Sequence, residues 1–128
     1  MRMRRLLQIL ALALACALAW PVAAWGGDAP PTGRALGDAR RGALLIAQYQ
    51  CGACHAIPGI ASARGTEGPP LAAYGLRSYI AGRVPNRPDL LARWIAQPAA
   101  LVPSTTMPDM GVPERDARDM AAWLSEQR

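Results

Sequence analysis

Two cysteines and one histidine are grouped in the segment Cys51-Gly-Ala-Cys54-His55. Two thiols separated by two residues can reach the two vinyl groups of one porphyrin, and a histidine directly after them can bind the iron. His55 is the only histidine in the chain, so no other imidazole is available as an iron ligand. The spacing therefore predicts one covalently attached haem c, with Cys51 and Cys54 as attachment sites and His55 as an axial ligand.

Zinc, a redox-active dithiol and a structural disulfide are the alternatives for this segment. A structural zinc site needs four ligands, and the only further cysteine is Cys16, near the N-terminus. A thioredoxin-like dithiol follows a strand and precedes a helix, whereas a helical pattern precedes Cys51 and a Gly- and Pro-rich stretch follows His55. These observations favour haem attachment over the other three.

The N-terminal residues have the pattern of a bacterial secretory signal peptide. A basic stretch ends at Arg5, an apolar stretch follows to about residue 20, and small residues precede Trp25. We therefore predict a signal peptide over residues 1–24 and a location in the periplasm or at the outer face of the cytoplasmic membrane. Lipid attachment at Cys16 and an uncleaved membrane anchor are alternatives, and either would hold the protein at the membrane.

The charge balance gives no indication of nucleic-acid binding. The whole chain has a formal charge of +5, with 14 arginines, no lysine and 9 acidic residues. Three arginines leave with the predicted signal peptide, so 11 remain against 9 acidic residues, a formal charge of +2. The sequence also lacks a basic run with interleaved aromatic residues.

We predict an all-α fold with one small domain over residues 38–128, preceded by a flexible, Gly- and Pro-rich leader over residues 25–37. Helices are expected from the N-cap Asp38 to about Gln50, near residues 77–81, from Pro88 to Pro98, and from about Pro113 onwards. Residues 56–75 and 98–113 are expected to be irregular, and no segment is predicted as a strand. The expected buried face of the first helix comprises Gly42, Leu45, Ile46 and Tyr49; that of the third comprises Leu91, Trp94 and Ile95; and that of the last comprises Ala117, Met120, Ala121 and Leu124.

Over about residues 38–126 the chain resembles the class I (monohaem) cytochrome c family of bacterial type. The matching segments are Gly42-x6-Tyr49, Cys51-Gly-Ala-Cys54-His55, Gly68-Pro69-Pro70-Leu71, Trp94-Ile95-Ala96-Gln97-Pro98, Pro103-Ser-Thr-Thr-Met107-Pro108 and Ala121-Ala-Trp123-Leu124. Residues 77–86 are most similar to the cytochrome c domain of some haem–copper oxidase subunit II proteins. The resemblance implies a small cytochrome c fold, with long loops around one haem.

The same resemblance implies that the N- and C-terminal helices cross. Gly42 would allow their close approach, and Tyr49 would meet Trp123 there. Two positions depart from the family pattern: Pro113 stands where a Ser or Thr cap is common, and Pro70 replaces a polar residue.

The resemblance also implies the surroundings of the haem. Met107 takes the place of the second axial iron ligand, with Met110 as the alternative. The carbonyl of Pro69 is expected to accept a hydrogen bond from Nδ1–H of His55. The remaining expected contacts are Leu71 on the haem face, Trp94 near the methionine side, and Arg77 and Thr105 at the propionates; for Arg77, a solvated surface position is the alternative.

Histidine and methionine together leave no open position on the iron, which indicates a single-electron carrier and not an enzyme. The expected partners are a redox protein donor and acceptor, with a terminal oxidase or a dehydrogenase as candidates. One alternative is a membrane-tethered haem subunit of one dehydrogenase or oxidase complex. Another is a haem sensor or weak peroxidase with a labile sixth ligand.

Overall fold

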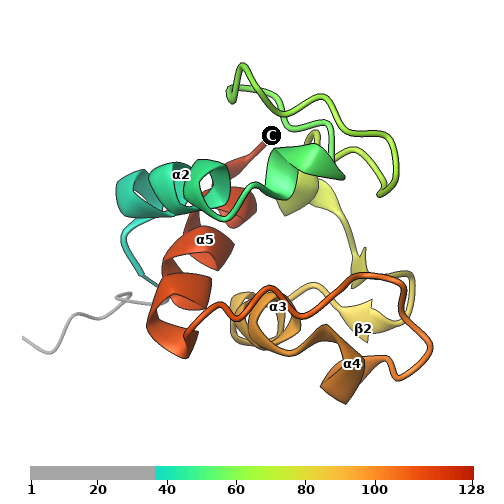
Figure 1. Cartoon of the computed structure of the whole chain (residues 1–128). Helices are drawn as coiled ribbons and strands as arrows, with labels where there is room; N and C mark the ends of the chain where they lie inside the picture. The colour runs from blue at the N-terminus through green and yellow to red at the C-terminus, as the bar shows by residue number, and fades with distance from the viewer. Residues whose placement is uncertain (1–36) are drawn as a thin grey trace, which may run out of the picture. The chain divides into compact units, whose positions relative to one another are not determined.

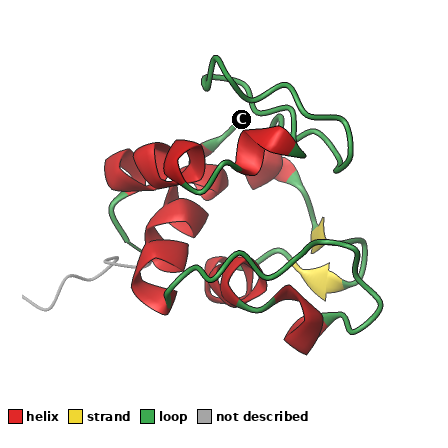
Figure 2. Cartoon of the chain, viewed as in Figure 1, coloured by secondary structure: helices red, strands yellow, loops and turns green. Residues whose placement is uncertain are grey.

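The computed structural model describes residues 37–128. The predicted signal peptide, Cys16 and all of the predicted leader except Gly37 lie outside these residues. The elements in chain order are α2 (Ala39–Gln48), the 3₁₀ helices η1 (Cys51–Ala53) and η2 (Tyr74–Leu76), strands β1 (Tyr79–Ile80) and β2 (Val84–Pro85), and helices α3 (Pro88–Ala96), α4 (Pro98–Leu101) and α5 (Glu114–Glu126). Long loops join them (Figures 1 and 2). Within residues 37–128, every helix is too short or too polar to cross a membrane.

Helix α2 begins where the sequence predicts. The side chain of Asp38 accepts hydrogen bonds from the backbone N–H groups of Arg40 and Arg41, at 2.9 and 3.2 Å. These bonds satisfy two of the donors that the first turn of a helix leaves free. The expected apolar face is confirmed, since Gly42, Leu45 and Ile46 are buried and Tyr49 is half-buried.

Helices α2 and α5 pack directly against each other, as Figure 1 shows. Gly42 allows this close approach because it has no side chain. A β-carbon at this position would clash with the carbonyl oxygen of Asp119 and stand 2.6 Å from its carbonyl carbon. Beside this contact, Arg41 forms ion pairs with Asp116, at 2.5 Å, and with Asp119. The first and last helices of the described residues are therefore joined by backbone packing and by charge.

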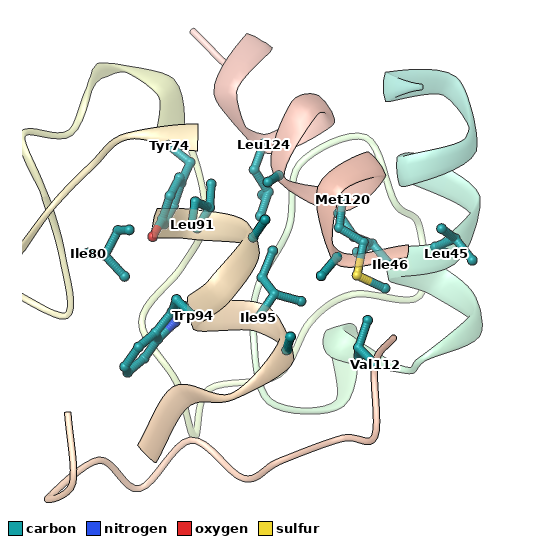
Figure 3. Close-up of a cluster of buried hydrophobic side chains, with 14 of the residues drawn as sticks. Leu45, Ile46, Tyr74, Ile80, Leu91, Trp94, Ile95, Val112, Met120 and Leu124 are labelled. Carbon is teal, nitrogen blue, oxygen red and sulfur yellow. The ribbon is translucent and has the colours of Figure 1, made fainter. Parts of the chain in front are cut away.

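The core lies between α2, α3 and α5. Residues of α5 expected in the core, including Met120, are almost fully buried. Figure 3 shows Tyr74, Ile80 and Trp94 toward one side of α3, and Met120, Ile46 and Val112 toward the other. Helix α5 starts after Pro113 with no side-chain cap, and Glu114 and Asp116 in its first turn complement the helix dipole as predicted.

The prediction of a helix near residues 77–81 is wrong, and so is a fold without strands. Tyr79–Ile80 and Val84–Pro85 form an antiparallel hairpin, with Ile80 opposite Val84. The turn residues Ala81 and Gly82 both have positive φ, 48° and 69°. The N–H of Arg83 donates to the carbonyl of Ile80 at 3.0 Å, so these two residues form the centre of a tight turn, and Arg83 completes the three-residue loop before Val84. The described residues are thus mainly helical with one small sheet.

The expected irregular segment 98–113 also contains a short helix, α4, over Pro98–Leu101. Helix α3 ends at Ala96, and Pro98 occupies a first-turn position of α4. Proline is tolerated there because the N–H groups of the first turn have no partner within the helix, so the missing N–H costs no hydrogen bond. Proline at this point therefore ends one helix and begins another. From Val102 to Pro113 the chain has no regular structure, as predicted.

Candidate haem-binding site

The Cys51–His55 segment forms a tight turn directly after α2. Gln50 adopts a left-handed conformation with φ of 55°, which turns the chain from α2 into η1. The N–H of His55 then donates to the carbonyl of Cys51 at 3.0 Å. Cys51 and Cys54 are free thiols, both half-buried, and Cys51 packs against the core. This turn presents both sulfurs and the imidazole from five consecutive residues.

The imidazole of His55 is held by one of its two nitrogens. Nδ1 lies 2.7 Å from the carbonyl oxygen of Pro69, the contact expected from the sequence. A carbonyl can only accept, so Nδ1 carries a proton, and in the neutral imidazole Nε2 then carries the lone pair. Within residues 37–128, Nε2 has no hydrogen-bond partner. Every fully buried side-chain nitrogen or oxygen in those residues does have a partner, so Nε2 is not fully buried and is accessible. His55 is therefore in the tautomer that binds a metal through Nε2.

The loop after the motif folds back closely onto it. The N–H of Gly68 donates to the carbonyl of Cys54 at 2.8 Å, and the N–H of Leu71 donates to Ala56 at 2.8 Å. Gly68 lies against the His55 ring, because a β-carbon there would stand 2.6 Å from Nδ1. The segment that supplies the Pro69 carbonyl is thus fixed on both sides by backbone hydrogen bonds to the motif.

Two of the expected pocket residues are only partly covered by protein. Leu71 and Met107 pack against the core but remain half-buried. Trp94, by contrast, is buried in α3, where only 8% of its surface is exposed. A large apolar ligand would bury the remaining exposed surface of such side chains.

Thr105 and Met107 are joined by a local hydrogen bond. The N–H of Met107 donates to Oγ1 of Thr105 at 3.1 Å, while the N–H of Thr105 donates to the carbonyl of Val102 at 3.0 Å. The structure thus gives Thr105 a role in shaping the loop that carries Met107; its expected propionate contact stays a prediction. Met110, the alternative ligand, is 45% exposed, and Met120 is buried in the core as expected.

Arg77 is not a freely solvated arginine. Its guanidinium donates to the carbonyl of Pro70 and, at 3.4 Å, to that of Ala72. The same group lies 4.9 Å from the centre of the buried Tyr74 ring. The structure therefore places Arg77 on the loop that holds His55, and its expected propionate contact also stays a prediction.

Tyr49 and Trp123 both pack against the core, as expected of residues near the crossing of the first and last helices. The hydroxyl of Tyr49 donates to Asp116 at 3.1 Å. Trp123 faces Gly59 of the long loop, whose β-carbon position lies 3.9 Å from the indole. Their direct meeting stays a prediction.

The donor set fits covalent haem better than the alternatives. Within residues 37–128, no three His, Cys, Asp or Glu side chains gather as a metal-binding cluster, and Cys51 and Cys54 are not bonded to each other. Burial raises the pKa of the Cys51 thiol, whereas a redox-active dithiol depends on a lowered one. Two free thiols, an accessible Nε2 and partly covered apolar residues fit a haem attached at both sulfurs.

The structure also identifies two residues to which the sequence assigns no role. Gly68 contacts the His55 ring, and Asn86 donates to the carbonyls of Tyr74 and Arg77, each at 3.0 Å. Gly68 has a sequence signal, since it stands directly before the proline that holds the histidine. Asn86 has a weaker signal, because asparagine is common wherever a chain turns and marks no particular partner.

Comparisons with known proteins give a partial match. No protein-family model matches the chain. A stretch of 90 residues is 31% identical to part of cytochrome c oxidase subunit 2 of Alkalihalophilus pseudofirmus. The match covers 70% of this chain and 25% of that protein, so the chain spans about a quarter of the length of the relative. The chain is therefore similar to part of a cytochrome c oxidase subunit 2.

Proposed function

We propose that this protein is an exported monohaem c-type cytochrome with a cytochrome c fold, which carries single electrons in a respiratory-type chain. The observation that carries the proposal is the hydrogen bond of 2.7 Å between Nδ1 of His55 and the Pro69 carbonyl. It leaves Nε2 ready to bind iron beside two free thiols that can form thioether bonds. The similarity to part of an oxidase subunit supports the respiratory setting.

In this proposal Cys51 and Cys54 would hold the haem covalently, and His55 and Met107 would bind its iron. Bound haem would supply an iron that exchanges one electron between its ferric and ferrous states. The chain's residues orient the ligands and exclude water: Pro69 fixes the imidazole and raises its basicity, and Leu71 covers apolar surface. Binding by both His55 and Met107 would leave no position on the iron for a substrate, which would suit a carrier and not an enzyme.

The test is to express the full chain in a bacterial host that matures c-type cytochromes. We expect the haem to stay with the polypeptide after denaturation and the mass of the polypeptide to increase by that of one haem. A potentiometric titration should follow a one-electron curve. Cys51→Ser and Cys54→Ser are each expected to leave one thioether, and Cys16→Ser serves as the control that keeps both. An exported, folded protein without covalent haem would refute the proposal.

A second candidate is a haem subunit dedicated to one oxidase or dehydrogenase complex, at the outer face of the membrane. The similarity to an oxidase subunit favours it. Fractionation of native membranes separates the two: a carrier is released as single molecules, whereas a subunit remains in a complex that also contains other redox centres. A carrier anchored by residues 1–24 or by a lipid on Cys16 remains with the membrane but separates from such a complex in mild detergent.

A haem sensor or weak peroxidase is the third candidate. It requires that Met107 leave the iron readily, and the half-buried position of this side chain makes the test worthwhile. Carbon monoxide that binds readily to the reduced protein at neutral pH would favour the sensor or peroxidase. An unchanged spectrum would favour the electron carrier.

A further inference from the structure

The Arg77 side chain is held in place on two sides. Its guanidinium lies 4.9 Å from the centre of the Tyr74 ring, which is 6% exposed. On its other side it donates to the backbone carbonyls of Pro70 and Ala72. A charged donor makes stronger hydrogen bonds than a neutral one, and the stacked ring restricts the guanidinium further. Arg77 is therefore a fixed anchor for the loop that contains Pro70.

Pro70 directly follows the residue that holds His55. Neither Pro69 nor Pro70 has an N–H, so the backbone of this dipeptide can form hydrogen bonds only through its two carbonyls. The Pro69 carbonyl accepts from His55, and the Pro70 carbonyl accepts from Arg77. Because each proline ring also fixes its own φ, the position of one carbonyl constrains the other.

Asn86 fixes the backbone from which Arg77 reaches this loop. Its side-chain amide donates to the carbonyls of Tyr74 and Arg77, each at 3.0 Å, and its N–H donates to Ser78 at 2.9 Å. Asn86 follows strand β2, whose partner strand contains the fully buried Ile80. The hairpin is thus tied to the loop through Asn86 and then Arg77.

We propose that Arg77 and Asn86 are positioning residues for the proximal histidine. They hold the Pro69 carbonyl at Nδ1 of His55 and so set the strength of that hydrogen bond. A stronger bond makes the imidazole a more basic ligand, and a more basic ligand favours the oxidised iron. This inference rests on the proposed haem site. In it, Arg77 acts on His55 indirectly, through the loop that contains Pro69 and Pro70.

The direct measurement is the exchange of the His55 Nδ1 proton with solvent, followed by NMR in the reduced, diamagnetic protein. Arg77→Ala and Asn86→Ala are each expected to speed this exchange by about tenfold, because each removes hydrogen bonds that keep the loop closed. Asn86→Ala, which changes no charge, is also expected to raise the reduction potential. Arg77→Lys retains the charge and a donor, and its exchange rate is expected between those of the wild type and Arg77→Ala.

Arg83→Ala is the matched control, because Arg83 is exposed in the hairpin turn and its loss removes the same charge. An exchange rate in Arg77→Ala equal to that in Arg83→Ala would overturn the proposal and leave Arg77 acting by charge alone. If Arg77→Ala does not fold, Arg77→Lys and Asn86→Ala decide by the same comparison. Failure of the haem site itself is distinguishable, because the wild type would then lack the haem spectrum.

Discussion

The imidazole of His55 and the α-carbon of Gly68 are in direct contact. A β-carbon at position 68 would clash with Cε1 and stand 2.6 Å from Nδ1. The φ of Gly68 is not in the left-handed region, so space alone requires glycine here. The ring of the proposed proximal ligand therefore rests between the backbone of Gly68 and the carbonyl of Pro69.

Gly68→Ala should displace the imidazole or the loop beside it. Overpacking of this kind typically costs about 1–3 kcal/mol, and here part of that cost should appear as a weaker His55–Pro69 hydrogen bond. Chemical unfolding of the haem-loaded protein measures the loss of stability, and the reduction potential reports the ligand. Thr66→Ala, an exposed change in the same loop, is expected to leave both unchanged. Equal behaviour of the two variants would show that the ring tolerates a methyl group.

Gly42→Ala tests the packing of α2 on α5. Alanine is the better helix former by about 1 kcal/mol, so propensity alone would make this variant more stable. The added methyl group would instead meet the backbone of Asp119, which cannot rotate away as a side chain can. The overpacking cost should exceed this gain, and we expect a net loss of about 2 kcal/mol in the free energy of unfolding.

Ala47→Gly, at an exposed position of the same helix, is the matched control for propensity. It should cost about 1 kcal/mol. A Gly42→Ala variant as stable as the wild type would mean that the two helices can separate at no cost. Thermal and chemical unfolding of both variants, followed by far-ultraviolet circular dichroism, gives the comparison.

Helices whose signals lie within a few residues could be predicted from the sequence. Asp38 caps α2 by accepting hydrogen bonds from residues two and three positions further along the chain. The spacing of apolar residues in α3 and α5 identifies the buried faces of these helices. The hairpin was missed because its turn places Ala81, an unusual residue for positive φ, beside Gly82. Nothing local marks Ala81 for that conformation, and strand pairing supplies the compensating hydrogen bonds.

In the candidate site, too, contacts marked by a local sequence pattern could be predicted, and contacts that depend on how distant segments pack could not. The Cys51–His55 spacing and the resemblance of the following Gly68–Leu71 segment are enough to predict the contact between His55 and Pro69. The protein partners of Arg77 depend on how the loop and the hairpin pack together, which no local pattern in the sequence specifies. The contact of Gly68 with the ring likewise depends on how residues 56–68 close back on the motif.

Met107→Ala and Met110→Ala test the proposed second iron ligand. Met107 packs against the core and its N–H is fixed by Thr105, whereas Met110 is 45% exposed. Loss of the iron–methionine charge-transfer band of the oxidised protein is expected in Met107→Ala only. The potential of that variant should also fall, since a thioether ligand favours the reduced iron. A band that survives in Met107→Ala and disappears in Met110→Ala would reverse the assignment.

The ion pairs between α2 and α5 should make the protein sensitive to acid. The Arg41 guanidinium, hydrogen-bonded to Asp116, lowers the pKa of that carboxyl below its ordinary value of 3.8. A lowered carboxylate pKa stabilises the fold fully above pH 3.8, and this stability is lost as pH falls through the lower pKa of the folded state. Arg41→Gln should therefore lower the unfolding midpoint near neutral pH and flatten its dependence on pH in the acid range.

Arg87→Gln is the matched control for this test. Arg87 pairs with Asp89 and lowers the pKa of that carboxyl too, but both side chains are more than half exposed. Water and salt screen such a pair, so its loss should change the midpoint little at any pH. The measurement is the urea midpoint from about pH 5 to pH 2 for the wild type and both variants. Parallel curves for the wild type and Arg41→Gln would mean that the helix crossing depends on backbone packing at Gly42 and not on charge.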